Sequence, residues 1–302
     1  MLTYYLLVPL FYFFAALPTS LLYRLAGVVA FVLNRIVGYR KAVVYSNLRN
    51  SFPEKSEDEI KAIADESYHH LADRVVENIK CLSIKQSEVE RRMTIKNAEV
   101  LQACYNKGLQ AIVMVGHIGS WEFGGYRLTT ASKYKLFGIV SLVKNPYFNR
   151  MIQRTRGKMG MELIPMNQSK EFFQKELPEL SLGVFISDQS PSNKEKAYWT
   201  KFLNQDTGFF TGGERYARLH NCAVLYPKIV QTRRGHYTAE FIMIAERPNE
   251  LPENAITEKF ARLLEQQIRE HPADWLWSHK RWKHKPPVLS GVENSHSAKP
   301  GV

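Results

Sequence analysis

Residues 108–122 read GLQAIVMVGHIGSWE, and this stretch carries the clearest structural signal in the chain. Gly108 to Val115 is a compact apolar run of strand length that ends at Gly116. Such a run is typical of a strand buried within a sheet. A segment able to form a helix begins soon afterwards, at Ser120. The sequence therefore predicts a strand, a loop and a helix in that order, with a histidine in the loop.

The same order recurs downstream of this stretch. Apolar runs of strand length cover residues 136–143, 163–166 and 182–186, and polar segments suited to helices lie between them at 146–159 and 168–177. This alternation predicts an α/β fold with a mostly parallel sheet flanked by helices. Further on, the apolar runs 223–230 and 237–245 flank Arg233, Arg234 and Gly235, which predicts a β-hairpin. A last helix is predicted over residues 255–269.

An amphipathic helix is predicted upstream of the first strand, over residues 56–80. Ser56 and Glu59 stand at the spacing of a capping box, in which each side chain bonds the other residue's backbone N–H. Apolar residues then follow at helical intervals, at Ile60, Ile63, Leu71, Val75 and Ile79.

The N-terminus predicts a retained membrane anchor. No charged side chain occurs from Met1 to Tyr23, which is about the length needed to cross the ~30 Å hydrocarbon layer. Basic residues lie only on its C-terminal side, which by the positive-inside rule leaves the bulk of the chain in the cytoplasm. The second apolar stretch, Leu25 to Val37, contains Arg35 and is expected to be an interfacial helix. A buried core helix is the alternative interpretation of the N-terminal run.

Three parts of the chain follow from these patterns. Residues 1–38 are expected to form the anchor and interfacial helices, residues 39–285 one catalytic domain, and residues 286–302 a flexible tail rich in Ser, Gly and Pro.

Composition and charge narrow the classes of partner. Lysine and arginine number 41 against 29 acidic residues, giving a formal charge of +12. This balance favours an acidic partner such as an anionic lipid, an acidic carrier protein or a nucleic acid. Cys81, Cys104 and Cys222 are far apart and form no CxxC pair, so the sequence suggests neither a disulfide framework nor a metal site.

His117 and Glu122 are the candidate chemical groups of the first loop. With nine histidines and 29 acidic residues, such a spacing is expected about once by chance, so the context must carry the argument. Active sites of α/β sheets collect at the carboxyl ends of strands, where His117 stands. A carboxylate nearby can hold an imidazole in the tautomer whose other nitrogen accepts a proton. The alternative is a histidine that only caps the following helix.

The pattern of a histidine, four residues and an acid after an apolar strand resembles the signature of the lysophospholipid and glycerolipid acyltransferase superfamily. The surrounding GHIGSWE is similar to the form found in the lipid A biosynthesis late acyltransferase family. Further segments agree with that family in order and spacing over residues 40 to 285: Asn47-Leu48, Ser51-Phe52-Pro53-Glu54, Asn145-Pro146 leading to Arg156, Ser187-Asp188-Gln189, His271-Pro272, Trp275-Leu276-Trp277 and His279-Lys280-Arg281-Trp282-Lys283.

The resemblance implies a membrane-bound O-acyltransferase of the bacterial inner membrane, with its catalytic domain on the cytoplasmic side. It would move a fatty acyl chain from acyl carrier protein or acyl-CoA to a hydroxyl of a lipid A precursor, an anionic glycolipid, without a cofactor, a metal ion or a nucleic acid. His117 would be the general base and Glu122 its orienter, and Arg156, Asp188 and Gln189 would bind substrate. Ser120 lacks the GxSxG spacing of a nucleophile elbow, which favours direct attack by the acceptor hydroxyl.

Two other interpretations stay open. One is an acyltransferase of the same fold that acts on a lysophospholipid, an aminolipid or another glycolipid. The other is a non-catalytic protein that binds membranes or nucleic acid, because the stretch Trp275–Lys283 interleaves tryptophans with basic residues. Such a cluster suits a membrane interface or a single strand, and tryptophans packed in the core are the alternative.

Overall fold

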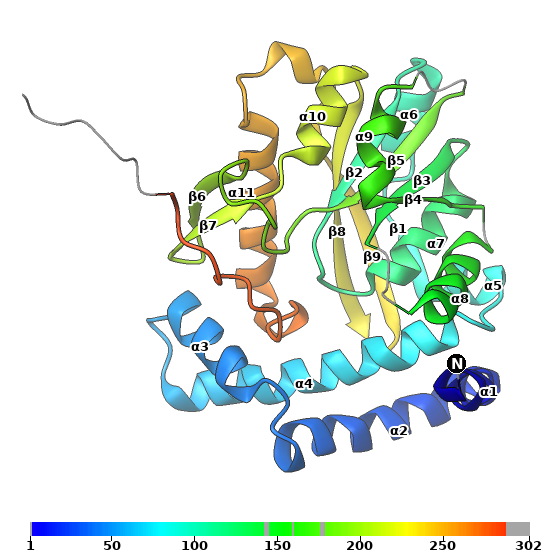
Figure 1. The fold of residues 1–302 in the computed structure, drawn as a ribbon, viewed down its shortest axis with the longest axis vertical. Coiled ribbons are helices and arrows are strands. Elements are labelled where there is room, and N and C mark those ends of the chain that lie inside the picture. The colour runs from blue at the N-terminus through cyan, green and yellow to red at the C-terminus, as the bar shows by residue number, and fades with distance from the viewer. Residues whose placement is uncertain (1, 142–144, 159, 176–178, 288–302) are drawn as a thin grey trace, which may run out of the picture.

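A seven-stranded sheet forms the centre of the molecule (Figure 1). The computed structural model describes residues 2–141, 145–158, 160–175 and 179–287. The strand order is β1 (Met93–Ile95), β9 (His236–Ala245), β8 (Ala223–Arg233), β2 (Ala111–Val115), β5 (Ser181–Ile186), β3 (Lys135–Val140) and β4 (Glu162–Pro165). Strands β8, β2, β5, β3 and β4 run parallel to one another, whereas β9 is antiparallel to β8 and parallel to β1. The predicted α/β fold with a mostly parallel sheet is confirmed.

Helices cover both faces of this sheet. From residue 41 onward, the described α-helices are α3 (Lys41–Ser51), α4 (Glu57–Lys80), α5 (Gln86–Arg92), α6 (Glu99–Asn106), α7 (Trp121–Ala131), α8 (Pro146–Gly157), α9 (Ser169–Phe173), α10 (Gly212–Leu219) and α11 (Ala255–Glu270). Side chains alternate between faces along a strand, so Ile112 and Met114 of β2 join a core with α10 and α11, while Ala111 and Val113 join a second core with α6 and α7. All five residues of β2 are buried as a result.

Most elements predicted from the sequence are present. Helix α4 begins after Ser56 with both hydrogen bonds of the capping box, and the hairpin is formed by β8 and β9. The segment predicted as a helix over 168–177 instead holds a 3-10 turn at Met166–Gln168 followed by the short α9, and residues 176–178 lie outside the described residues. Strand β1, helices α3, α5 and α6, and a second hairpin were not predicted from the sequence.

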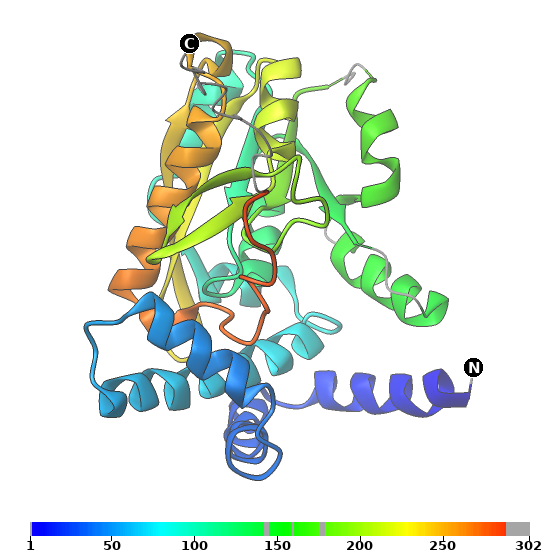
Figure 2. The ribbon, with the colours of Figure 1, turned by 60° about the vertical axis from the view of Figure 1, so that its left-hand side comes forward.

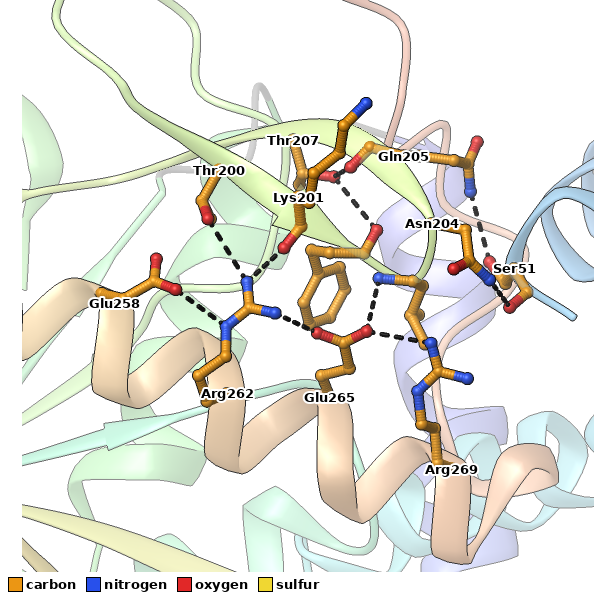
Figure 3. A network of polar contacts seen from close by, with 12 residues as sticks. Ser51, Thr200, Lys201, Asn204, Gln205, Thr207, Glu258, Arg262, Glu265 and Arg269 are labelled. Atoms are coloured by element: carbon orange, nitrogen blue, oxygen red, sulfur yellow. Dashed lines mark hydrogen bonds and ion pairs between the residues drawn. The ribbon is translucent and has the colours of Figure 1, made fainter.

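That second hairpin consists of β6 (Tyr198–Phe202) and β7 (Gln205–Phe209). Figure 3 shows how a polar network fastens it to α11: Glu265 accepts the backbone N–H of Leu203, and Arg262 bonds the backbone carbonyl of Lys201. The hairpin in turn holds the C-terminal segment, because Arg281 donates to the carbonyl of Gly208 and Trp282 donates to Thr207. It therefore sets the course of residues 275–282.

The apolar N-terminus forms two helices rather than one. Helix α1 (Leu2–Ala16) ends just before Pro18, and α2 (Thr19–Phe31) continues into a π-helical turn at Val32–Ile36. The uncharged run from Met1 to Tyr23, from which an anchor was predicted, is therefore divided at Leu17 and Pro18, where the backbone is not helical. The stretch Thr19–Ile36 is by length and composition the one described helix that could cross a membrane, and 28% of it is buried.

Helix α2 lies along α4, and α1 extends sideways at the same end of the molecule (Figures 1 and 2). Leu22, Tyr23 and Ala26 of α2 pack against Ala72 and Val76 of α4. Polar contacts hold both ends of the stretch Thr19–Ile36, since Thr19 bonds Glu88 and Arg35, in the π-helical turn, pairs with Asp65. This N-terminal segment also exposes large apolar side chains, at Leu10, Tyr12, Phe13, Leu21, Val28, Val29, Phe31, Ile36 and Val37.

Candidate active site

His117 and Asp188 meet because their strands are neighbours in register. Strands β2 and β5 pair in parallel with Val115 opposite Ile186. Each side chain stands two residues beyond its member of that pair, and the pairing continues through the bond from the Ser187 N–H to the Val115 carbonyl, 3.0 Å. The carboxyl ends of parallel strands meet at one edge of a sheet, which is where α/β proteins gather functional groups.

The carboxylate of Asp188 holds His117 at two points. Oδ1 lies 2.6 Å from Nδ1 of the imidazole, and Oδ2 accepts the backbone N–H of His117 at 2.8 Å. With Nδ1 bonded to an ionised carboxylate, the ring proton resides on Nδ1 and the lone pair is on Nε2. Gln189 lies 3.1 Å from Nε2, where its amide N–H can donate to that lone pair. The arrangement leaves His117 poised to accept a proton through Nε2.

The electrostatics of the pair keep Asp188 ionised. Its side chain is only 2% exposed. Burial by itself raises the pKa of Asp188, but attraction to His117 and the hydrogen bonds from His117 and Trp275 outweigh burial and lower that pKa to about 2. Asp188 is therefore a fixed negative charge that can stabilise an imidazolium.

Two glycines of the motif lie where a side chain would be crowded. A Cβ on Gly116 would lie 2.7 Å from a methyl group of Leu264 and 3.3 Å from Oδ2 of Asp188. Gly119 has a φ of +60°, and a Cβ there would lie 2.7 Å from the side chain of Ile229. At Gly119 the loop between β2 and α7 therefore follows a path that other residues cannot take without strain, whereas a side chain at Gly116 would require Leu264 to move.

Glu122 pairs with Arg156 rather than with His117. The guanidinium of Arg156, on α8, forms two hydrogen bonds with the carboxylate of Glu122, which lies in the first turn of α7; the Nε bond measures 3.2 Å. Among the described residues, no hydrogen bond or ion pair joins Glu122 to His117. The prediction that Glu122 orients the imidazole is thus corrected: Asp188 takes that position, because α7 begins only at Trp121 and the loop before it is not helical.

The Glu122–Arg156 pair lines two adjoining pockets. The larger has a volume of about 320 Å³ and is lined by Phe11, Val75, Asn78, Ile79, Cys81, Leu82, Glu122, Met151, Ile152, Thr155 and Arg156. The smaller, about 60 Å³, opens over the ends of β3 and β5 and is also lined by Trp121. Trp121 contacts the His117 ring edge to face, with 5.0 Å between ring centroids. One aromatic side chain thus connects the imidazole to the smaller pocket.

Arg156 keeps its positive charge at this position. Burial lowers its pKa, but the attraction and hydrogen bonds of Glu122 outweigh burial, so the pKa of Arg156 is raised. Its side chain is 32% exposed. Only part of the five-donor guanidinium is used by Glu122, so the rest can face a substrate.

The C-terminal tryptophans belong to the core. Trp275 is 4% exposed, Trp277 1% and Arg281 2%, so the interpretation of this stretch as a membrane or nucleic-acid surface is wrong for these residues. Trp275 donates its indole N–H to Oδ2 of Asp188 at 2.8 Å, and Ile118 forms a β-bridge with it. The sequence had singled out this segment, yet it did not indicate that Trp275 supports the carboxylate.

His279 is a second histidine near the pair. Its Nε2 accepts the backbone N–H of Ser190 at 3.2 Å, which requires the neutral ring. Burial lowers the pKa of His279 to about 4, partly opposed by Asp188. Within the described residues no group of three or more His, Cys, Asp or Glu side chains is placed to hold a metal ion, and Cys81, Cys104 and Cys222 are all buried.

Comparison with known proteins points to one family. The family model described as bacterial lipid A biosynthesis acyltransferase matches residues 1–284. A lipid A biosynthesis palmitoleoyltransferase of Escherichia coli (strain K12) is 22% identical over 256 residues, which cover 82% of this chain and 80% of that protein. A lipid A biosynthesis acyltransferase of Shigella flexneri shows the same identity and coverage.

Proposed function

The chain belongs to the bacterial lipid A biosynthesis acyltransferase family, and we propose that it transfers a fatty acyl chain from a thioester donor to a hydroxyl of a lipid A precursor. The family membership gives an acyltransferase of lipid A biosynthesis with an acyl donor and a lipid A-type acceptor. The observation that supports the chemistry is the His117–Asp188 pair, which presents a basic nitrogen at the edge of the sheet.

In this proposal His117 acts as a general base. Nε2 removes the proton of the acceptor hydroxyl, the oxygen attacks the thioester carbonyl, and the thiolate of the donor leaves and takes up a proton from the imidazolium. Asp188 keeps Nδ1 protonated and stabilises the imidazolium while it exists. Gln189 bonds the atom that must receive the acceptor's proton, so the acceptor hydroxyl would replace its amide there.

Arg156 is proposed to stabilise the negative charge that develops on the carbonyl oxygen. A guanidinium offers a planar set of donors, and such donors act most strongly when they are fixed before the reaction. Glu122 fixes Arg156 through two bonds, so its contribution to catalysis would act through Arg156. The same guanidinium could hold a phosphate of the acceptor, and both uses require its position beside the pockets.

The larger pocket is proposed to receive the acyl chain. It is lined mainly by apolar side chains, with Glu122 and Arg156 as its charged groups, so a chain inside it would have its polar end beside them. Phe11 from α1 contributes to its wall, which connects the pocket to the N-terminal helices.

These helices are proposed to attach the enzyme to the inner membrane, with the catalytic domain on the cytoplasmic side. Their exposed apolar side chains lie at one end of the molecule, and exposed Arg24, Arg35 and Lys41 accompany them, which suits an anionic lipid surface. Helix α2 would lie in the interface rather than span, because α4 and its charged side chains cover one side of it.

A transfer assay tests the function. The full chain in vesicles is supplied with labelled acyl carrier protein or labelled acyl-CoA, and with either a phosphorylated glucosamine disaccharide lipid or a lysophospholipid. Transfer to the disaccharide lipid that disappears in His117→Ala is the expected result. Transfer only to the lysophospholipid would contradict the lipid A acceptor, and no difference between wild type and His117→Ala would contradict the proposed base.

Membrane attachment has a separate test. Phe13→Asp combined with Phe31→Asp should reduce co-flotation with anionic vesicles, whereas Leu219→Asp, an equally exposed apolar position on α10, should not. Equal flotation of the two variants would contradict attachment through the N-terminal helices.

A further inference from the structure

Glu77 is a buried carboxylate outside the pairs described above. It lies on α4, is 2% exposed and accepts three hydroxyl groups. Tyr23 and Tyr237 both donate to Oε1, at 2.7 and 2.6 Å, and Ser120 donates to Oε2 at 2.9 Å. An unpaired buried carboxylate is costly, so a site with three donors on one carboxylate is built to keep that group in place.

The three donors come from separate parts of the fold. Tyr23 belongs to α2, Tyr237 to β9, and Ser120 to the loop between His117 and Glu122. Burial raises the pKa of Glu77, whereas Arg74 and the three hydroxyl groups act against that rise. The carboxylate thus joins an N-terminal helix, the sheet and the candidate active-site loop.

The side chain of Ser120 bonds Glu77 instead of capping α7. It occupies the N-cap position of α7, where a serine side chain normally accepts a backbone N–H of the first helical turn. Here the side chain makes no capping bond. Because such a capping bond normally stabilises a helix, the turn of Ser120 toward Glu77 indicates that the bond to the carboxylate decides its orientation.

A second residue of α4 holds the neighbouring position of the loop. Arg74, one turn before Glu77, lies over the ring of Trp121 at 5.8 Å and donates to the backbone carbonyl of Asp274 at 2.8 Å. Trp121 in turn contacts His117. Helix α4 therefore contacts both Ser120 and Trp121, through Glu77 and Arg74. These two residues lie between the proposed base and Glu122.

We propose that Glu77 is a positioning residue for the acyl transfer: by holding Ser120 it sets the path from His117 to Glu122, and through Tyr23 it ties that path to the seating of α2 on α4. This role rests on the proposed function. It acts on the rate of the chemical step rather than on donor binding, because Glu77 borders neither pocket and reaches the reacting atoms only through the loop.

Kinetics of three single variants and two of their combinations test the role. Glu77→Gln and Ser120→Ala should each lower kcat on the order of 10- to 100-fold, the size of loss that a misplaced catalytic group causes, and leave the donor KM within about twofold. The double variant should be no slower than the slower single variant, because both remove one interaction. Tyr23→Phe should lower kcat less, and should add little to Glu77→Gln.

Tyr68→Phe is the matched control, because Tyr68 is also buried on α4 and donates to the carbonyl of Tyr39 at 2.7 Å, away from the loop. It should lose stability and keep kcat. Hydrogen exchange of residues 117–122 should quicken in Ser120→Ala and not in Tyr68→Phe, which is a readout independent of turnover.

The outcomes separate this inference from the proposed function. If the wild-type chain transfers no acyl group, the proposed function is contradicted. Hydrogen exchange of residues 117–122 would still test whether Glu77 holds the loop in place. Wild-type kcat in a folded Ser120→Ala variant, or kcat losses that multiply in the double variant, would overturn the positioning role. Unchanged kcat in Tyr23→Phe would overturn the link to α2.

Discussion

Trp275 donates its indole N–H to Oδ2 of Asp188 although the two residues are 87 positions apart in the sequence. This bond and the two contacts with His117 occupy both oxygens of the carboxylate. Asp188 is therefore held from the β2 loop and from the C-terminal segment at once, and its orientation depends on both.

Trp275→Phe should lower kcat roughly 10-fold, because a hydrogen bond to a charged group is worth about 1.5–3 kcal/mol. Trp277→Phe is the matched control, since Trp277 is also buried but donates to the carbonyl of Pro272 at 2.6 Å. Both variants should lose stability in thermal unfolding, and only the first should lose turnover. Equal kcat values for the two variants would show that Trp275 serves packing alone.

His117→Ala should lower kcat by about 10²–10⁴-fold, the usual contribution of a general base. Asp188→Asn should cause a loss of similar size, because an amide can hold the imidazole in the wrong tautomer. The double variant should be little worse than either single one, since the two groups act as a unit. Asp73→Asn, which weakens a pair with Arg234 elsewhere on α4, should keep turnover. If the losses in kcat of the two single variants multiplied in the double variant, His117 and Asp188 would not act as a unit.

The Glu122–Arg156 pair should show coupling in a double-mutant cycle. Arg156→Lys removes the two-pronged contact and should lower kcat, whereas Arg154→Lys, an exposed neighbour on α8, should not. The cycle of Glu122→Gln with Arg156→Lys should give an interaction energy of about 0.5–3 kcal/mol in kcat/KM. A value near zero would mean that Glu122 acts independently of Arg156.

Filling the larger pocket should change the preferred chain length. Ile152→Trp reduces the space, so kcat/KM should fall more for long acyl donors than for short ones. Each methylene group that no longer fits in the pocket should cost about 0.8 kcal/mol, so the loss should grow with chain length. Leu219→Trp, at an exposed position outside the pocket, should leave the preference unchanged. A uniform fall for all donors would place the acyl chain elsewhere.

His279 should make stability depend on pH between about 6.5 and 4. Its folded pKa is lowered to about 4, so within this window the unfolded chain, with a histidine pKa near 6.5, binds more protons than the folded one. Stability should therefore fall as pH falls through the window. His279→Gln should flatten this part of the profile of unfolding temperature against pH. An unchanged slope would contradict the burial of a neutral ring.

The sequence predicted the sheet and the position of His117 at its edge, because β2 is an apolar run of strand length bounded by glycines and His117 follows it directly. It could not predict the carboxylate partner. Strand order is a property of the whole fold, and nothing local to Asp188 says that β5 lies beside β2. The spacing to Glu122 misled because no helical turn joins the two residues: Gly119 has a positive φ, and α7 begins only at Trp121.

The C-terminal segment shows a second limit of sequence reasoning. Tryptophans interleaved with basic residues have the same composition at a lipid interface and in a core. Burial of Trp275 and Trp277 depends on the β6–β7 hairpin, which was not predicted, and on Arg281 donating into that hairpin. The role of Glu77 could not be predicted either, because the sequence of its helix shows only an amphipathic pattern. Its three hydrogen-bond donors come from distant positions in the sequence.

His117 and Asp188 each stand two residues beyond the paired residues Val115 and Ile186. This equal offset restricts where insertions and deletions can occur without loss of activity. Loss of one codon between either strand and its functional residue would shift that side chain by about 3.3 Å and turn it toward the opposite face. Codons gained or lost in the connections would leave the offset intact. Insertions and deletions that preserve activity are therefore expected in the connections between elements and not within residues 115–117 or 186–188.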